Sequence, residues 1–281
     1  MTTVSIIGAG DVGGACAHAL ARRDVVSRVL LVDAAARVAA GKALDIRQSA
    51  PVDLFHTQLE GTDDPARIVG SSVCIVADRF GPPVAEWNGE DALAHLSRLR
   101  PYVGNAVLMF AGATHADLLM STTREAGYRR ERVVASSPET IRAAIRSLVA
   151  LEAHCSPADV MLTVLGAPPR FVVPWTEASI GGYALDRVLT TVQVARIEAR
   201  AARLWPPGAY ALGAAAARIT EAIVSTSRQM MTVLTVLDGE FGIRGRAGTL
   251  PVLLAPSGVA QTRVPQLNTR ERVLVETALL G

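Results

Sequence analysis

The chain has 281 residues, of which 50% are hydrophobic and 19% are charged. This composition supplies enough apolar surface for a sizeable core and excludes an intrinsically disordered chain. The 28 basic residues nearly balance the 26 acidic ones, and the arginines are scattered, so we expect no nucleic-acid partner. The longest apolar runs fall short of the about 20 residues that span a bilayer, and the N-terminus lacks a signal pattern. We therefore expect a cytoplasmic protein without a membrane partner.

Cysteine usage gives no sign of a metal or redox centre. Cys16, Cys74 and Cys155 are odd in number, and their spacing matches neither zinc-binding nor redox patterns. Cys16 and Cys74 lie within apolar runs, which is typical of small core residues. We expect no bound metal.

A glycine-rich loop follows the first expected strand at residues 4–7 and precedes a helical pattern. The order of strand, G-x-G-x-x-G loop and helix predicts a dinucleotide-binding turn. Gly8 permits the tight turn, Gly10 lets the backbone approach a pyrophosphate, and Gly13 lets helix and strand pack closely. The N-terminus of the following helix then offers free N–H groups to the phosphates.

The second expected strand, at residues 28–32, ends in Asp33, 20 positions after Gly13. At this distance a carboxylate can accept hydrogen bonds from the adenosine ribose and would repel a 2′-phosphate. The sequence therefore favours NAD, while the neighbouring Arg37 keeps NADP open as an alternative. The residues that we expect to contact the cofactor are Gly8, Gly10, Asp11, Val12, Gly13, Asp33, Ala77 and Asp78.

Further strand patterns alternate with helical ones, which predicts a doubly wound parallel sheet of the α/β class. We expect a Rossmann domain at residues 1–140 and a mixed α+β substrate domain at residues 141–281. The segments that we expect to form strands are 73–77, 106–110, 133–135, 160–166 and 242–265, and those that we expect to be helical are 141–148, 183–203 and 212–236.

Several motifs, widely spaced along the chain, share their order with one known family. They are Gly8–Gly13, Gly41–Ile46, Ser49–Val52, Glu131–Val134, Ser156–Val160, Val164–Gly166, Leu250–Val252 and Val264–Asn268. With them the chain resembles the lactate/malate dehydrogenase family over nearly its whole length. The resemblance implies a Rossmann domain followed by a substrate domain, NAD as cofactor, and reduction of a 2-keto acid.

The residues that perform this reaction in the family are not found at the matching positions. The resemblance implies a histidine proton donor, an aspartate that orients it and an arginine that clamps the substrate carboxylate; here Pro168, Ile141 and Ala144 take those places. The two loop arginines and the asparagine that steadies nicotinamide and substrate are replaced as well. The residues at these positions are Gly81 or Pro83, Gly89, and Gly112 or Ala113.

These replacements predict that lactate and malate are not ordinary substrates, because each lost group costs orders of magnitude in rate. Two alternatives stay open: a divergent NAD-dependent oxidoreductase acting on another substrate, and a non-catalytic NAD(H)-binding pseudoenzyme that serves as a redox sensor or partner subunit. The candidates for a different chemistry are His115 and Arg79. The alanine-rich helices near residues 15–21 and 212–236 predict a homodimer or homotetramer.

Overall fold

A twisted parallel sheet organises the first half of the chain in this computed structural model, which describes residues 2–81, 87 and 89–281. Its six strands run in the order β3-β2-β1-β4-β5-β6, all parallel, so the order reverses between β1 and β4. The strands are β1 (Thr3–Ile7), β2 (Arg28–Val32), β3 (Gln58–Thr62), β4 (Val73–Val76), β5 (Val107–Phe110) and β6 (Val133–Ala135). This is the strand order of a Rossmann sheet, which confirms the predicted fold class.

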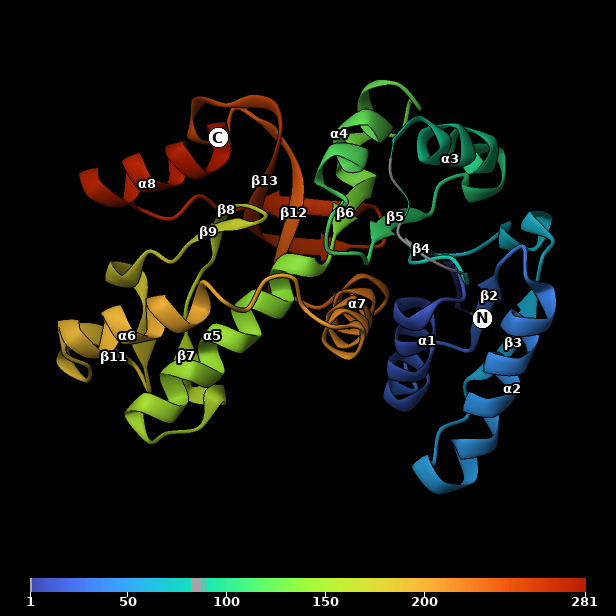
Figure 1. The fold of residues 1–281 in the computed structure, drawn as a ribbon, viewed down its shortest axis with the longest axis horizontal. Helices are drawn as coiled ribbons and strands as arrows, with labels where there is room; N and C mark the ends of the chain where they lie inside the picture. Colours follow the sequence, from blue (N-terminus) through green and yellow to red (C-terminus); the bar gives the residue numbers. More distant parts are fainter. Residues whose placement is uncertain (1, 82–86, 88) are drawn as a thin grey trace.

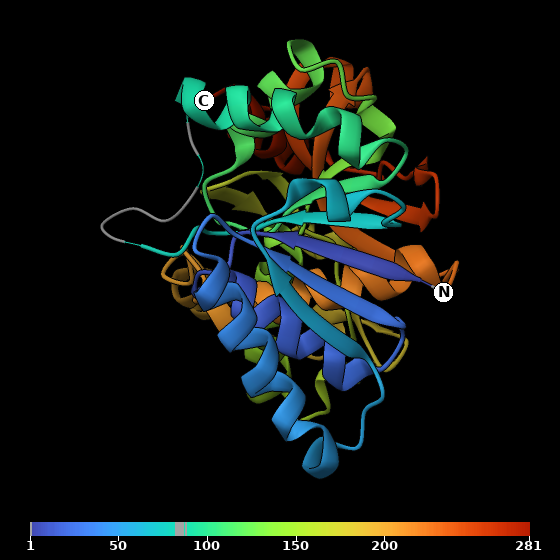
Figure 2. The same cartoon turned by 90° about the vertical axis from the view of Figure 1, so that its right-hand side faces the viewer.

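Helices cover both faces of this sheet, as Figure 2 shows with α2 on one side and α3 on the other. The helices of the first half are α1 (Asp11–Arg23), α2 (Ala36–Asp53), α3 (Gly89–Val103) and α4 (Ala116–Arg124). Alternate residues of each strand enter two separate cores, since successive side chains of a strand point to opposite faces. In β1, Ile6 faces the core under α1 and α2, while Ile7 faces the core under α3 and α4.

Strands from the second half extend the same sheet beyond β6 (Figure 1). There β12 pairs antiparallel with β6 through Leu234 and Ala135, and β13, β8 and β9 follow outward. The strands of the second half are β7 (Val160–Met161), β8 (Leu165–Ala167), β9 (Arg170–Val172), β10 (Ser179–Ile180), β11 (Tyr183–Ala184), β12 (Met230–Asp238), β13 (Arg244–Ala255) and β14 (Gly258–Thr262). Since one sheet runs through both halves, the domain boundary at residues 140 and 141 stays a prediction.

A third core lies apart from the large sheet, in the lower left of Figure 1. It joins α5 and α6 to the small sheet β11-β10-β7 through residues such as Ile145, Val160 and Ile197. The helices of the second half are α5 (Ser137–Ala153), α6 (Thr191–Ala201), α7 (Ala209–Val224) and α8 (Thr269–Leu280).

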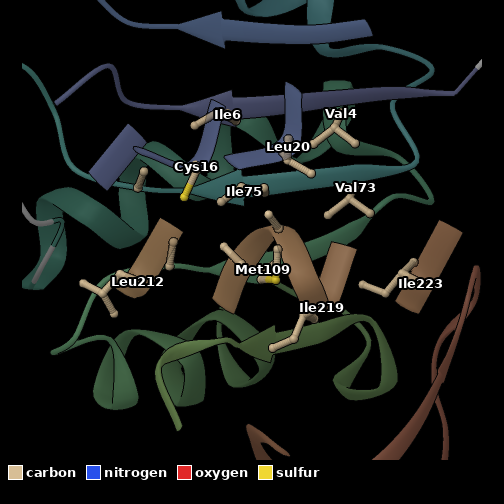
Figure 3. Packing of buried hydrophobic residues seen from close by; sticks show 14 of the residues in the cluster. Val4, Ile6, Cys16, Leu20, Val73, Ile75, Met109, Leu212, Ile219 and Ile223 are labelled. Carbon is tan, nitrogen blue, oxygen red and sulfur yellow. The ribbon is translucent and has the colours of Figure 1, made fainter. Parts of the chain in front are cut away.

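The helix α7 binds the two halves together, because it packs between α1 and α5 (Figure 1). Figure 3 shows Leu212, Ile219 and Ile223 of α7 in one cluster with Cys16 and Leu20 of α1 and with strand residues. The small-residue faces of α1 and α7 are therefore buried against each other within one chain. The faces that α1 and α7 bury against each other are not available to a second copy, and the homodimer or homotetramer stays a prediction.

Two helical predictions need correction. The segment 212–236 is helical only to Val224, and Met230–Asp238 forms strand β12. Its run of Thr, Val and Leu is buried on both faces between β6 and β13, where β-branched residues pack well. The segment 183–203 begins with the short strand β11, and α6 starts only at Thr191 behind the capping residue Thr190. Among residues 2–81, 87 and 89–281, no helix is long and apolar enough to cross a membrane.

The packing of α1 on α7 predicts opposite effects for two glycine-to-alanine substitutions. A Cβ on Gly213 of α7 would lie 2.6 Å from the Ala15 carbonyl carbon and 2.8 Å from its Cβ, so Gly213→Ala forces the helices apart. We expect it to lower the free energy of unfolding by about 1–3 kcal/mol. A Cβ on Gly41 of α2 meets no atom within 4 Å, so Gly41→Ala should raise it by about 0.5–1 kcal/mol. Urea denaturation measures both, and wild-type stability of Gly213→Ala would contradict the packing.

Candidate functional site

The candidate site lies at the carboxyl ends of β1 and β4, where the strand order of the sheet reverses. In open α/β sheets, ligands bind in the crevice that this reversal creates. The loop after β1 carries Gly8 and Gly10, and the loop after β4 carries Ala77 and Asp78. The structure thus brings these predicted cofactor residues together.

The glycine loop is held directly against the end of β4. Gly8 has a φ of +107°, and a Cβ at this position would overlap the carbonyl of Asp78. A Cβ on Gly13 would overlap the carbonyl of Gly8, so the first turn of α1 packs tightly on the turn before it. The Gly10 N–H donates to the Asp78 carbonyl at 2.9 Å. Only glycine permits these contacts, which give a backbone surface that a pyrophosphate can approach closely.

Asp33 lies at the end of β2 and is 8% exposed. Its Oδ2 accepts from the Ala9 N–H at 2.8 Å and from the Phe80 N–H at 3.0 Å, and its Oδ1 accepts from the Ala35 N–H at 2.9 Å. The carboxylate therefore connects the glycine loop, the start of α2 and the loop after β4. This position, beside the glycine loop, fits an acceptor for ribose hydroxyls.

Asp78 contributes its side chain as well as its backbone to the glycine loop. Its Oδ1 accepts from the Gly13 N–H at 2.9 Å, and the residue is 7% exposed. Burial raises the pKa of the Cys16 thiol, and the Asp78 carboxylate raises it further. Cys16 is thus held as an unreactive thiol, as expected for a core residue.

Lys42 is a site residue that the sequence reasoning missed. Its Nζ donates to the Gly10 carbonyl at 2.6 Å and lies 3.9 Å from the carboxylate of Asp11, whose side chain is 94% exposed. Lys42 places a positive charge beside the loop where an anionic cofactor would bind. The available signal was that Lys42 is the one lysine in the chain and lies within the Gly41–Ile46 motif.

Arg79 follows Asp78 and is held by aromatic contacts. Its guanidinium lies 4.6 Å from the centre of the Trp87 ring, and Trp87 stacks on His95 of α3 with ring centres 4.2 Å apart. Burial lowers the pKa of His95, and the positive charges of Arg98 and Arg79 lower it further. Trp87 thus contacts both the Arg79 guanidinium and the His95 ring, and its aromatic ring attracts the cation.

His115 ends the loop after β5 and precedes the first residue of α4. Its ring is buried, with the residue 1% exposed, and packs edge-on against Phe110 with ring centres 5.4 Å apart. A Cβ on Gly112 would overlap this imidazole. The histidine ring thus fills the space that a side chain at position 112 would occupy.

The positions where the family's catalytic groups were expected lie in the second half. Ile141 is 3% exposed in the core of α5 and α6, Ala144 follows on α5, and Pro168 lies between β8 and β9. Of the loop positions where the resemblance implied arginines, Gly81 and Gly89 are among the residues that the structure describes, and Pro83 lies outside them.

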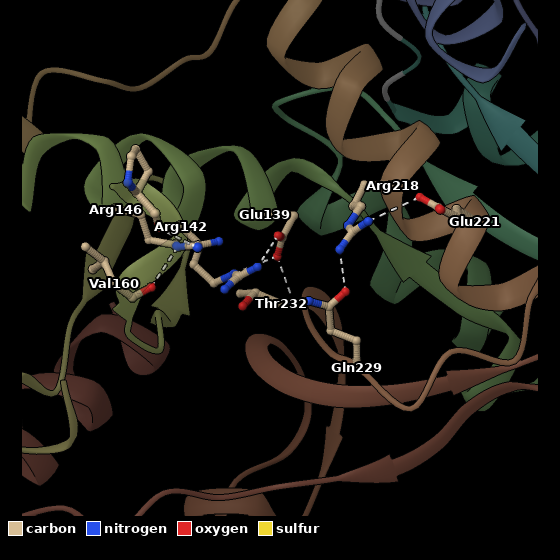
Figure 4. Close-up of polar contacts among 9 residues, drawn as sticks. Glu139, Arg142, Arg146, Val160, Arg218, Glu221, Gln229 and Thr232 are labelled. Carbon is tan, nitrogen blue, oxygen red and sulfur yellow. Dashed lines mark hydrogen bonds and ion pairs between the residues drawn. The ribbon is translucent and has the colours of Figure 1, made fainter. Parts of the chain in front are cut away.

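The charged residues of α5 are engaged in structural contacts (Figure 4). Arg142 forms a two-point ion pair with Glu139, whose Oε2 also accepts from the Thr232 N–H of β12 at 3.1 Å. Arg146 donates to the Val160 carbonyl at 2.9 Å, and burial lowers its pKa, with the nearby Arg142 charge adding to this effect. Glu139 thus joins α5 to β12, and Arg146 joins α5 to β7.

Comparison with known proteins identifies relatives of the whole chain. Residues 2–80 match the family described as lactate/malate dehydrogenase, NAD binding domain. The chain is 29% identical to the malate dehydrogenase of Cytophaga hutchinsonii, over 98% of this chain and 94% of that protein. It is 28% identical to the malate dehydrogenase of Salinibacter ruber, over 98% of this chain and 93% of that protein.

Solved structures show the same relationship. The structure of the Salinibacter ruber malate dehydrogenase matches with a TM-score of 0.87 and 26% identity, covering 99% of this chain and 94% of that one. The lactate dehydrogenase of Cryptosporidium parvum, solved with lactic acid and NAD, has the same fold, with a TM-score of 0.90 at 22% identity over 99% of this chain and 94% of that one. The predicted cofactor, NAD, is confirmed by the match to the NAD-binding domain.

Two functional predictions from the sequence are wrong. The expectation of a substrate other than ordinary 2-keto acids, or of a pseudoenzyme, is contradicted by similarity to malate dehydrogenases over nearly the whole chain. The expectation that lactate or malate dehydrogenase activity is absent is contradicted by the same finding. Both rested on single aligned positions such as Pro168, and a group missing from one position does not exclude a group supplied from another.

The Rossmann order of the sheet, the glycine loop packed against β4, and relatives that align with both halves support one conclusion. Residues 2–80 match the NAD-binding domain of lactate/malate dehydrogenases, and the chain as a whole is similar to malate dehydrogenases.

Proposed function

We propose that this protein is an NAD-dependent dehydrogenase that interconverts a small 2-hydroxy acid, malate or lactate, and the corresponding 2-keto acid. The observation that carries this proposal is the similarity to malate dehydrogenases, which extends over 98% of the chain rather than the NAD-binding half alone.

The cofactor side of the site consists of Gly8, Gly10, Gly13 and Asp33. The glycine loop offers a close backbone surface, the first turn of α1 offers N–H donors, and Asp33 lies beside both. Bound NAD supplies the hydride chemistry, so the protein has to orient the substrate and move a proton. We include Asp11, Val12 and Ala77 in the same site because they border this loop and the end of β4.

We assign the proton transfer to His115. It lies at the carboxyl end of β5, the strand next to β4, and its imidazole takes the space left by Gly112. Histidine is the side chain whose ordinary pKa is best suited to proton transfer near neutral pH. Its enclosure between Phe110 and the Gly112 backbone holds the ring in one place.

We assign recognition of the substrate carboxylate to Arg79. It is the residue directly after Asp78, in the loop that follows β4. Its guanidinium lies over the Trp87 ring, and this contact uses the face of the guanidinium rather than its N–H groups. A planar guanidinium can hold a carboxylate through two parallel hydrogen bonds.

The assembly and domain division belong to the same proposal. We propose a Rossmann domain at residues 1–140, a substrate domain at residues 141–281, and a homodimer or homotetramer in solution. Exposed apolar residues of α2 and its end, Leu44, Val52 and Leu54, support a contact between copies, with exposed fractions of 46%, 83% and 79%.

The proposed activity predicts that the protein oxidises NADH with oxaloacetate or pyruvate. Loss of absorbance at 340 nm measures the reaction, and we expect turnover of about 1 per second or more with one of the two acids, in the ordinary enzyme range. A preparation that binds NADH but shows no oxidation with either acid, at millimolar concentration, would contradict the proposal. Boiled protein and an assay without keto acid are the controls.

The assignment of His115 predicts a selective loss of rate. His115→Asn keeps a polar side chain of similar size but removes the titrating group, so kcat should fall by about 10²–10⁴-fold. The dissociation constant for NADH should stay within about twofold, since the imidazole acts on the substrate. A variant with unchanged kcat, or one that loses NADH binding to the same extent, would contradict the assignment.

The position of Asp33 predicts the preference between the two nicotinamide cofactors. Asp33→Asn keeps an oxygen that can accept from the Ala9 N–H but removes the charge, so NADH binding should weaken about tenfold and the preference over NADPH should narrow. Fluorescence titration with each cofactor measures both effects. Equal affinity of the unmodified protein for NADH and NADPH would refute this role.

A further inference from the structure

The residues directly after β4 are held by the same groups that the dinucleotide would use. At one end of the segment Asp78–Phe80, the Asp78 Oδ1 accepts from the Gly13 N–H at 2.9 Å. At its other end, the Phe80 N–H donates to the Asp33 Oδ2 at 3.0 Å. One of these contacts uses a donor of the phosphate site, and the other uses an acceptor of the ribose site.

The Asp78 carboxylate occupies the position of an anionic ligand. Gly13 is the third residue of α1, and its N–H belongs to the first turn, whose donors have no partner within the helix. The carboxylate also lies against Gly10, since a Cβ there would overlap it. A pyrophosphate that uses this turn would meet a buried negative charge at hydrogen-bonding distance from its own donor.

The carboxylate of Asp33 has most of its acceptor positions occupied by the protein itself. It accepts three backbone hydrogen bonds, from Ala9, Ala35 and Phe80, at 2.8–3.0 Å. A carboxylate offers about four acceptor positions, so two ribose hydroxyls cannot both be accepted while the Phe80 N–H stays bound. Binding of the pyrophosphate and binding of the ribose therefore both require the segment Asp78–Phe80 to move away from Gly13 and Asp33.

We infer that Asp78 is a built-in competitor for the cofactor pyrophosphate and that it sets the affinity of the site for dinucleotides. In the free protein its carboxylate caps α1 through Gly13, and NAD binds when this side chain leaves. The competition concerns binding alone, so it goes beyond the proposed dehydrogenase activity and is measured without turnover.

Two substitutions of Asp78 test the inference. Asp78→Asn keeps an acceptor for the Gly13 N–H and removes the charge, and Asp78→Ala removes both. We expect the dissociation constant for NADH to fall in both variants, by about tenfold or more in Asp78→Ala, because a charge-charge repulsion at about 4 Å and a competing hydrogen bond are relieved. Titration of NADH fluorescence and calorimetry with ADP-ribose measure the affinities.

ADP-ribose locates the effect, because it contains the pyrophosphate but no nicotinamide. Binding of both ligands should tighten by the same factor. A matched control is Asp24→Asn, since Asp24 accepts from the His56 and Thr57 N–H groups at the opposite end of α1. Like Asp78→Asn, this variant keeps an acceptor and removes a negative charge, but away from the glycine loop, so it should bind both ligands as the wild type does.

Thermal denaturation without ligand separates affinity from stability. Loss of the contact to Gly13 should lower the melting temperature of Asp78→Ala without ligand, although this variant should bind NADH more tightly than the wild type. The inference is overturned if both Asp78 variants fold but bind NADH no more tightly than the wild type. It is equally overturned if only NADH and not ADP-ribose responds, which would place Asp78 at the nicotinamide.

Discussion

The contact between the end of β4 and the first turn of α1 is the constraint on which the rest of the site depends. The Gly10 N–H donates to the Asp78 carbonyl at 2.9 Å, and Gly8 approaches the same carbonyl so closely that no side chain fits. Since β1 and β4 are neighbours at the reversal of strand order, this contact determines how far the crevice opens there. The first turn of α1, Asp33 after β2 and the loop bearing Arg79, where we propose the cofactor and substrate groups, are all arranged around it.

The sequence predicted the parallel sheet well because its inner strands are short apolar runs bounded by turn residues. Strand β3 was not predicted, since Gln58–Thr62 lies at the sheet edge, is only partly buried and contains Gly61. A Cβ on Gly61 would overlap the backbone of α2, so the glycine reflects a tertiary contact. The helical prediction for β12 failed because a strand buried on both faces lacks alternation and resembles a buried helix in sequence.

Part of the candidate site could likewise be predicted from local sequence spacing, and part of it depends on tertiary contacts. The glycine loop and Asp33 are encoded by spacing within one strand-helix-strand unit, and the structure brings them together. The contacts of Asp78 with Gly13, of Lys42 with Gly10 and of Phe80 with Asp33 join residues 65, 32 and 47 positions apart. Such contacts depend on how the loops fold over the strands, and a pattern of residue types does not reveal them. The functional prediction failed for a related reason, because it examined aligned positions one at a time, in both halves of the chain.

The distribution of charge in the two halves bears on where substrate chemistry takes place. On α5, Glu139 and Arg142 satisfy each other and the Thr232 N–H, and both are largely buried. Separating such a buried pair is costly, since one partner is left as an uncompensated charge. The neighbouring Ile141 and Ala144 side chains of the same helix carry no charge. By contrast, the loops after β4 and β5 carry a cation and an imidazole that are placed by aromatic contacts: Arg79 lies over the Trp87 ring, and His115 packs edge-on against Phe110. The proposed function therefore assigns the substrate carboxylate and the proton transfer to groups of the first half of the chain.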